Sequence, residues 1–322
     1  MRILITAPYN QDGQKELSGI AEVVYRSWKP QGRAYNEEEL MALLEETAAD
    51  ALITEHDHVT ARVIEAFPAL RFIGVCRGTP SNVALDAAAR LGIPVFHTPA
   101  RNAQAVAELF VANVITLLRK TIPARQWLVD GRWDEGAHTS YLEFKGNELA
   151  GKSVGLVGFG AIGRRIASML ENFPCTIHFY DPYVTEYNQR YRRMELDELF
   201  SESDIVSIHL PVTNDTRGMI DGSLISLMKK DAIFVNTARA AVVKRDGLLE
   251  AIENGRIRGA ILDVFDHEPP DETDYRLIRH PNVLATPHTA GATDEVEDHH
   301  VSIMNAQVLK HFAASAEPIQ TK

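Results

Sequence analysis

The chain has 322 residues, of which 45% are apolar and 24% are charged, so it is expected to fold and is not globally disordered. Its length favours two domains. The formal net charge of −11 argues against a large surface for nucleic acid or anionic membranes. Cys76 and Cys175 are too few for a disulfide framework or a structural zinc site, and no apolar run approaches the length of a membrane span. We therefore expect a cytoplasmic globular protein with no nucleic-acid or membrane partner.

The first hundred residues alternate β-branched runs with helical periodicity. Four short runs are the predicted strands: 3–6, 51–54, 71–75 and 94–96. Helices are predicted between them at 37–46 and 86–91, which is typical of a parallel sheet with helices on both faces. From residue 102 to residue 120, apolar side chains recur at three- and four-residue steps, and this predicts a long helix that bridges two domains. The aromatic segment 126–147 has weak periodicity and is expected to form an arm or an interface.

A second alternation begins at Gly151. The predicted strands are five: 153–158, 176–180, 204–209, 232–236 and 260–264. Helical periodicity falls between them at 161–171, 221–229 and 245–254, and a last amphipathic helix is predicted at 293–314. This order is typical of a doubly wound, Rossmann-type domain that binds a dinucleotide.

A glycine-rich loop supports that interpretation. Gly158, Gly160 and Gly163 fit the pattern G-x-G-x-x-G, in a loop that follows one predicted strand and opens the next predicted helix. The first glycine permits the tight turn, the second lets the backbone approach a pyrophosphate, and the third lets helix and strand pack closely. The pattern alone is weak, and a ligand-free glycine turn is the alternative. The strand–loop–helix context favours the cofactor site.

Asp181 lies 18 positions after Gly163, at the end of the next predicted strand. A carboxylate there can accept hydrogen bonds from both ribose hydroxyls of a dinucleotide. It is followed by Pro182 and Tyr183, with no adjacent arginine to hold a 2′-phosphate. NAD is therefore favoured over NADP.

Three polar segments follow later predicted strands, at 236–239, 263–269 and 286–291. Because ligands bind at the carboxyl ends of strands in such a sheet, we expect these segments beside the cofactor. Arg239 can bind a substrate carboxylate with two hydrogen bonds. His288 can exchange a proton with a carbonyl or hydroxyl oxygen, and Glu268 can stabilise its imidazolium form. This set suits the reduction of a carbonyl group.

These motifs together resemble the D-isomer-specific 2-hydroxyacid dehydrogenase family, in its short, phosphoglycerate dehydrogenase-like form. The resemblance covers nearly the whole chain and rests on five motifs: the glycine loop with Asp181, His209-Leu210-Pro211 with Thr216, NTAR from Asn236, DVF-x-x-EP from Asp263, and PH-x-AG-x-T from Pro287. It implies an NAD-dependent enzyme that interconverts a D-2-hydroxy acid and its 2-keto acid by hydride transfer.

The resemblance also implies roles for particular residues. Arg239, Glu268 and His288 would be catalytic, with His288 as the acid/base, and Arg77, Gly78, Thr79 and Arg239 would bind substrate. Asp263 would lie near the nicotinamide amide. The implied cofactor site is larger: Gly158, Gly160, Ala161, Ile162, Gly163, Asp181, Leu210, Pro211, Thr216, Thr237, Ala238, Arg239, Asp263, His288 and Gly291.

The fold implied by the resemblance is α/β, with doubly wound parallel sheets. A flavodoxin-like substrate domain would comprise 1–100 and 291–322, and a Rossmann-type NAD-binding domain would be inserted at 101–290, with catalysis at the cleft. We also expect a homodimer built through the cofactor domain and its aromatic arm. Because the chain stops at Lys322, a regulatory domain like that of long-form phosphoglycerate dehydrogenases is not expected.

Four alternatives stay open at this stage. The cluster 294–300, which includes His299 and His300, is better explained as a solvated helix start than as a metal site, and no metal is predicted. Arg77 and Arg101 could bind a second anionic group of the substrate, or could be solvated loop residues. The enzyme could be a formate- or phosphite-type dehydrogenase. The chain could also be an NAD(H)-sensing binding protein on the same fold.

Overall fold

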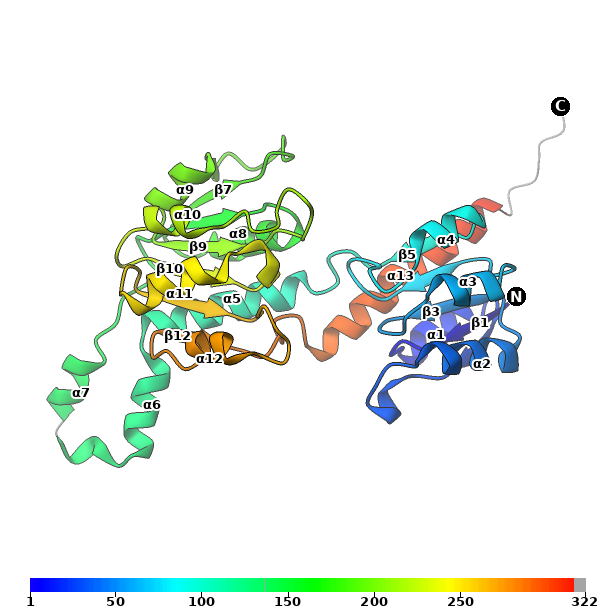
Figure 1. Ribbon diagram of the computed structural model, residues 1–322, viewed down its shortest axis with the longest axis horizontal. Helices are drawn as coiled ribbons and strands as arrows, with labels where there is room; N and C mark the ends of the chain where they lie inside the picture. Colours follow the sequence, from blue (N-terminus) through cyan, green and yellow to red (C-terminus); the bar gives the residue numbers. More distant parts are fainter. Residues whose placement is uncertain (136, 316–322) are drawn as a thin grey trace. The chain divides into compact units, whose positions relative to one another are not determined.

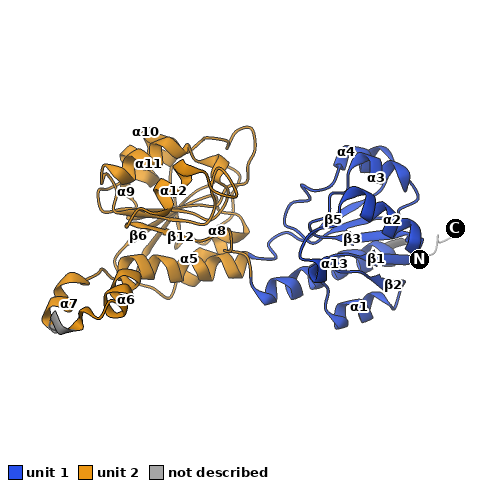
Figure 2. Cartoon of the chain, turned by 60° about the horizontal axis from the view of Figure 1, so that its bottom comes forward, with its two compact units in different colours: residues 1–102, 293–322 blue, residues 103–292 orange. Residues whose placement is uncertain are grey.

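The computed structural model describes residues 1–135 and 137–315, and the chain divides into two compact units (Figures 1 and 2). Unit 1 comprises residues 1–102 and the chain from Thr293 onward, and unit 2 comprises residues 103–292. The sequence placed these divisions after residues 100 and 290. Within the described part of the chain, no helix has the length and apolar character needed to cross a membrane.

Unit 1 is built on a five-stranded parallel sheet in the order β2-β1-β3-β4-β5. Its strands are β1 (Arg2–Ile5), β2 (Glu22–Tyr25), β3 (Ala51–Thr54), β4 (Ile73–Val75) and β5 (Val95–His97). This is the flavodoxin-like strand order, in which the chain winds outward in both directions from the first strand. The predicted parallel α/β fold is confirmed for this unit.

Helices cover both faces of that sheet. They are α1 (Gln11–Leu17), α2 (Glu37–Thr47), α3 (Ala61–Ala66), α4 (Leu85–Arg90) and α13 (Asp294–Ser315), with a short 3-10 turn, η1 (Lys29–Gln31). Leu40 and Leu44 of α2 pack in one core, with α3 and α4. Met304 and Val308 of α13 pack in the other core, on the opposite face. α13 therefore belongs to the same unit as the first hundred residues, although it is the last helix in the sequence.

Unit 2 contains a seven-stranded parallel sheet in the order β12-β11-β10-β9-β6-β7-β8. The strands are β6 (Ser153–Val157), β7 (Thr176–Tyr180), β8 (Arg192–Arg193), β9 (Ile205–Ile208), β10 (Ile233–Asn236), β11 (Gly259–Leu262) and β12 (Val283–Ala285). Read from β6, this is the Rossmann order with one added strand. The winding reverses between β6 and β9, and this switch point is where such sheets bind ligands.

Two apolar cores lie on the two faces of the second sheet. The covering helices are α5 (Ala103–Leu118), α8 (Ala161–Leu170), α9 (Leu196–Glu202), α10 (Gly222–Leu227), α11 (Arg245–Glu253) and α12 (Glu272–Ile278), with the 3-10 turn η3 (Ala240–Val242). The long helix predicted at 102–120 is α5, and it packs on α8. The predicted Rossmann-type architecture is confirmed.

The segment expected to form an arm is helical. It contains α6 (Thr121–Val129), η2 (Arg132–Glu135) and α7 (Ala137–Glu143), and both views show α6 and α7 extending away from the rest of unit 2 (Figures 1 and 2). Trp127 is buried against Phe144, with ring centroids 5.8 Å apart. Six large apolar side chains of the arm are exposed: Ile122, Leu128, Val129, Trp133, Tyr141 and Leu142.

Candidate functional site

The glycine loop lies at the carboxyl end of β6, at the switch point of the sheet. Gly158 has φ +95°, and a Cβ there would lie 2.7 Å from the carbonyl oxygen of His209. A Cβ on Gly163 would collide with the carbonyl oxygen of Gly158. A Cβ on Gly160 would meet nothing within 4 Å. Packing therefore requires glycine at 158 and 163, whereas Gly160 faces open space.

That open space lies at the N-terminus of α8. Gly160 is the N-cap residue, and no described side chain caps the helix, so the first backbone N–H groups point toward the space beyond it. An uncapped N-terminus with a partial positive charge fits a pyrophosphate group. Ala161 and Ile162 contribute this first turn, as the sequence predicted.

Asp181 follows β7 and is held beside the glycine loop. Its Oδ2 accepts a hydrogen bond from the backbone N–H of Phe159 at 2.8 Å, and its Oδ1 accepts one from Tyr183 at 2.9 Å. The carboxylate is thus oriented at the position where a ribose would follow a pyrophosphate on α8. The hydroxyl of Thr237, at the end of β10, is buried without a partner among the described residues. These features fit a bound dinucleotide.

The segment after β9 forms a tight loop of the same site. The Thr216 hydroxyl donates a hydrogen bond to the carbonyl oxygen of Pro211 at 2.6 Å and accepts one from the N–H of Thr213 at 2.8 Å. Leu210 packs against the core of this face. The Thr216 side chain therefore fixes the loop.

His209 begins that loop and is not a candidate proton donor. Its Nε2 lies 2.8 Å from the Ser207 hydroxyl, and its Nδ1 is buried with no hydrogen-bond partner in the described structure. Burial lowers the pKa of His209 to about 3, because the charged ring would lose its hydration. The ring therefore stays neutral near pH 7 and acts as a packing residue.

The loop after β10 presents Arg239. The Asn236 side chain accepts a hydrogen bond from the N–H of Ala238 at 3.0 Å and donates one to the carbonyl oxygen of Arg239 at 3.1 Å. The guanidinium of Arg239 is exposed, and its hydrogen bond in the described structure goes to the Ala238 carbonyl at 2.6 Å. Asn236 is therefore a positioning residue, and within the described part of the chain no carboxylate forms an ion pair with Arg239.

Asp263, at the end of β11, organises the loop that carries His288. Its Oδ1 accepts hydrogen bonds from the Thr286 hydroxyl at 2.5 Å and the Thr289 N–H at 2.9 Å, while its Oδ2 accepts one from Ala290 at 2.8 Å. The carboxylate is almost fully buried. The sequence suggested a contact with cofactor for Asp263, and the structure adds this role in holding the loop.

His288 has a backbone conformation that favours glycine, with φ 53°. Non-glycine residues adopt it at a cost of about 1–3 kcal/mol, and such strain is concentrated at functional sites. The N–H of His288 donates a hydrogen bond to the carbonyl oxygen of Thr286 at 3.0 Å. Gly291 lies in the turn that follows, in which the N–H of Ala292 donates to the carbonyl oxygen of Thr289 at 2.9 Å. The chain turns sharply here and presents the imidazole.

Glu268 and His288 form a hydrogen-bonded pair. Nδ1 of His288 lies 2.8 Å from Oε2 of Glu268, and the two side chains are 47% and 44% exposed. Oε1 of Glu268 accepts a weaker hydrogen bond from the N–H of Phe265 at 3.4 Å. The pair uses Nδ1, so Nε2 is the nitrogen available to a ligand.

Both residues line one pocket with Arg239. The pocket has a volume of about 620 Å³, lies within unit 2, and is also lined by the basic side chains Arg217, Lys244 and Arg245. A volume of this size accommodates a small ligand together with part of a cofactor. A guanidinium, an imidazole and a carboxylate that share one pocket can bind an acid and exchange a proton with it.

The residues predicted to bind substrate in unit 1 lie in the loop after β4. The carbonyl oxygen of Arg77 accepts a hydrogen bond from Thr98 at 2.9 Å, and that of Gly78 lies 3.0 Å from Nδ1 of His97. Thr79 is exposed in the same loop. These contacts tie the loop to the end of β5.

Arg101 is not a solvated loop residue. Its guanidinium lies 2.7 Å from Oε1 of Glu55 and 3.0 Å from Nδ1 of His300, and its side chain is 16% exposed. The alternative that placed it in solvent is therefore wrong. Its charge is balanced by the buried carboxylate of Glu55, so it serves the packing of unit 1.

The acidic and histidine side chains at the start of α13 contact separate partners in unit 1. Glu297 pairs with Lys29 at 2.5 Å, Asp298 accepts a hydrogen bond from Asn10 at 2.6 Å, and the buried His300 contacts the carbonyl oxygen of Pro8 at 2.7 Å. The side chains do not converge on one point. They join the helix to unit 1.

Known proteins have similar sequences over most or all of this chain. Residues 111–290 match the model of the family described as "D-isomer specific 2-hydroxyacid dehydrogenase, NAD binding domain". The chain is 56% identical to the Bacillus subtilis protein named "Putative 2-hydroxyacid dehydrogenase YoaD", covering all of this chain and 94% of the relative. It is 34% identical to a D-3-phosphoglycerate dehydrogenase of Methanocaldococcus jannaschii, covering 96% of this chain but only 57% of that enzyme.

A solved structure gives the same result. The D-lactate dehydrogenase of Aquifex aeolicus, complexed with NAD and lactic acid, superposes with a TM-score of 0.75 at 26% identity, covering 98% of this chain and 96% of that one. The similarity of fold and the family match point to the same family. The chain belongs to the D-isomer specific 2-hydroxyacid dehydrogenase family and is an NAD-dependent oxidoreductase.

Proposed function

We propose that this protein interconverts a D-2-hydroxy acid and its 2-keto acid with NAD as the hydride carrier, and that His288 is its acid/base. The observation that carries the proposal is the hydrogen bond of 2.8 Å between His288 and Glu268, in a pocket that also holds Arg239. A histidine with a carboxylate partner is a common proton donor in catalysis.

The three side chains would divide the work as follows. Arg239 binds the substrate carboxylate, because its planar guanidinium can donate two parallel hydrogen bonds. Nε2 of His288 then lies toward the carbonyl oxygen at C2 and donates its proton to it. Glu268 accepts the hydrogen bond from Nδ1 and stabilises the imidazolium before transfer. The bound nicotinamide supplies the hydride to C2, which becomes the CH–OH carbon.

Unit 2 would hold the cofactor. The backbone of Gly158, Gly160 and the first turn of α8 would bind the pyrophosphate, and Asp181 would accept hydrogen bonds from the ribose hydroxyls. The other cofactor-binding residues would come from the loops that follow β9, β10 and β11 and from the His288 loop: Leu210, Pro211, Thr216, Thr237, Ala238, Asp263 and Gly291. Of these, Asp263 would lie near the nicotinamide amide.

Unit 1 would be the substrate-binding domain. The loop after β4 carries Arg77, Gly78 and Thr79, and a Cβ on Gly78 would meet nothing within 4 Å. Open backbone of this kind can present N–H groups to a carboxylate. Because its charge is balanced by Glu55, Arg101 is a weak candidate for binding a second anionic group on the substrate.

The exposed apolar surface of the arm supports a homodimer. Trp133, Tyr141 and Leu142 are 59%, 71% and 73% exposed, and apolar surface concentrated in this way is typical of protein interfaces. We expect two copies to cover it by pairing through unit 2. Light scattering at micromolar concentration should give twice the 35.8 kDa mass of one chain, and a monomer mass would refute the dimer.

A panel of keto acids tests the proposed activity. NADH oxidation is measured with glyoxylate, hydroxypyruvate, pyruvate and 3-phosphohydroxypyruvate, and at least one should be turned over. Tight NADH binding with no turnover across the panel would favour an NAD(H) sensor. Oxidation of formate or phosphite in place of these reactions would assign the chain to that other class of dehydrogenase.

A further inference from the structure

The loop that carries Glu268 is held by a single arginine from another element. The loop runs from the end of β11 to the start of α12, and Arg245 is the first residue of α11. The side chain of Arg245 is 20% exposed, and that of Asp274, its most deeply buried partner, is 1% exposed. This ion pair is therefore largely shielded from solvent.

Arg245 contacts the loop on both sides of Glu268. Its Nη1 donates hydrogen bonds to both carboxylate oxygens of Asp271 at 2.9 Å and to Oδ1 of Asp274 at 3.0 Å. Its Nε lies 3.4 Å from Oδ2 of Asp266. The pKa of Arg245 is raised, since these carboxylates outweigh the lowering effect of burial.

The carboxylates that Arg245 binds also fix the backbone of the loop. Oδ2 of Asp274 accepts hydrogen bonds from the N–H groups of His267 at 3.1 Å and Asp271 at 3.2 Å. Asp271 is the N-cap of α12 and forms a reciprocal capping box with Asp274. Glu268 is thus enclosed between two anchored ends of a short loop.

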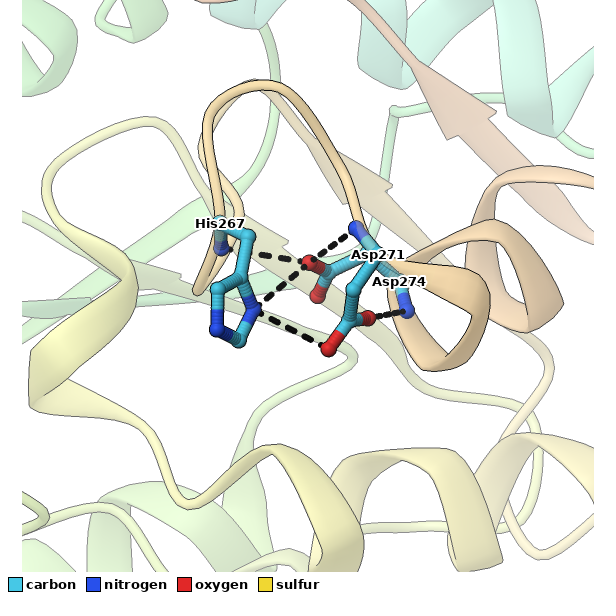
Figure 3. Close-up of side chains that lie close together, drawn as sticks. All are labelled: His267, Asp271 and Asp274. Atoms are coloured by element: carbon cyan, nitrogen blue, oxygen red, sulfur yellow. Dashed lines mark hydrogen bonds and ion pairs between the residues drawn. The ribbon is translucent and has the colours of Figure 1, made fainter.

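The same cluster contains side chains that could ligate a metal. His267, Asp271 and Asp274 have ligand atoms within 4.8 Å of one another, and Figure 3 shows the imidazole turned toward the two carboxylates. Nδ1 of His267 lies 3.0 Å from Oδ2 of Asp271. However, the guanidinium of Arg245 already supplies the positive charge that these carboxylates need. A divalent cation would have to displace it, so the cluster is better explained as an arginine-centred network.

We propose that Arg245 is a positioning residue for the acid/base pair: it anchors the loop at Asp266, Asp271 and Asp274 and so holds Glu268 in contact with His288. This inference rests on the proposed function of that pair. The planar guanidinium lets Nη1 reach Asp271 and Asp274 while Nε lies beside Asp266, and the single ammonium group of a lysine cannot occupy both places. Without Arg245, the loop would sample positions in which Glu268 no longer reaches Nδ1.

The role of Arg245 determines in which direction its removal shifts the pH at which His288 loses its proton. Besides His288, the charged and titratable groups that line the pocket are Arg217, Arg239, Lys244, Arg245, Asp266, His267 and Glu268. If Arg245 acted only through its charge, removing it would leave more uncompensated negative charge and would help His288 keep its proton. If Arg245 acts by positioning Glu268, removing it would weaken the hydrogen bond and make His288 lose its proton at lower pH. The two explanations give shifts of opposite sign.

The test is the pH profile of kcat for keto-acid reduction in four variants. Glu268→Gln removes the partner itself and should move the upper limb of the profile by about one pH unit toward acid. Arg245→Gln should move it in the same direction by about half a unit. Arg245→Lys keeps the charge but cannot place donors beside both Asp266 and Asp274, and it should give a smaller acid shift. This variant also carries the test if Arg245→Gln fails to fold.

Arg276→Gln is the matched control. Arg276 on α12 binds Glu253 on α11 through both carboxylate oxygens, at 2.7 and 2.8 Å, so it joins the same two helices as Arg245 without contacting the loop. This variant should leave the profile unchanged. An unchanged profile in Arg245→Gln, an alkaline shift, or an equal acid shift in Arg276→Gln would overturn the proposal.

An NMR titration of the His288 ring separates this inference from the proposed activity, because it needs no substrate. The midpoint should fall in Arg245→Gln and stay constant in Arg276→Gln, even if the wild type reduces no keto acid in the panel. A midpoint that does not fall in Arg245→Gln would overturn the positioning role. Turnover by the wild type would still stand in that case.

Discussion

Replacing His288 by alanine is expected to lower kcat for keto-acid reduction by about 100- to 10,000-fold at every pH. The variant lacks the imidazole whose Nε2 donates a proton when the hydride is transferred to C2. His209 cannot replace it, because that ring is buried and neutral. Steady-state kinetics with NADH and the best keto acid of the panel measure the effect. KM should change much less than kcat, because Arg239 still binds the carboxylate.

His280→Ala is the control for that experiment. His280 follows α12 in the same unit, lies outside the pocket, and its Nδ1 accepts a hydrogen bond from the Asn282 N–H at 3.2 Å. Its loss should leave kcat within about twofold of the wild type. If His288→Ala retained a comparable kcat, another residue would have to be the proton donor.

The second large effect concerns the choice of cofactor. NADH should exceed NADPH by at least about 100-fold in kcat/KM, since a 2′-phosphate would lie against the carboxylate of Asp181 and cost a few kcal/mol. Backbone N–H groups of Phe159 and Tyr183 orient that carboxylate, so it cannot turn away without losing two hydrogen bonds. Kinetics with each cofactor at saturating keto acid measure the ratio.

Asp181→Asn tests whether the carboxylate is the cause. The amide keeps the shape and removes the charge, so the preference for NADH should fall by about tenfold or more. Asp197→Asn, on the surface helix α9, is the control and should leave the ratio unchanged. Equal use of NADH and NADPH by the wild type would show that the function assigned to this loop is wrong.

Much of the fold could be predicted because the parallel strands are buried on both faces. Strands such as β3 and β9 consist of four fully buried, mostly apolar residues, as expected for sheets covered by helices on both sides. β2 was not predicted. It is an edge strand that begins with the exposed Glu22, and its other three residues are only partly buried. α3 and α9 were also not predicted: they are six and seven residues long and give a weak helical period, although α4, of similar length, was predicted.

The arm shows the limit of periodicity in a different way. Ile122, Leu128 and Val129 are exposed on α6, so the apolar residues there do not define one buried face within the chain. A helix whose apolar residues are partly exposed in this way gives weak periodicity in the sequence. The sequence therefore predicted an arm or an interface in this segment but did not predict its helices.

The candidate site was predictable where it depends on strand ends. Arg239, Glu268 and His288 follow successive strands, and adjacent carboxyl ends bring such residues into one pocket. The supporting contacts were not predictable from the pattern. Arg245 reaches Asp266 and Asp274 from another helix, and no local spacing indicates that contact. Asp263 likewise holds the His288 loop through hydrogen bonds that only the tertiary structure brings together.

The most direct test follows the hydride itself. A keto acid from the panel is reduced with NADH that carries deuterium at C4 of the nicotinamide, on the face from which it is transferred, and the product is analysed for isotope and chirality at C2. We expect the product to be a D-2-hydroxy acid with deuterium bound to C2. A product without deuterium at C2, or one with the L configuration, would contradict it.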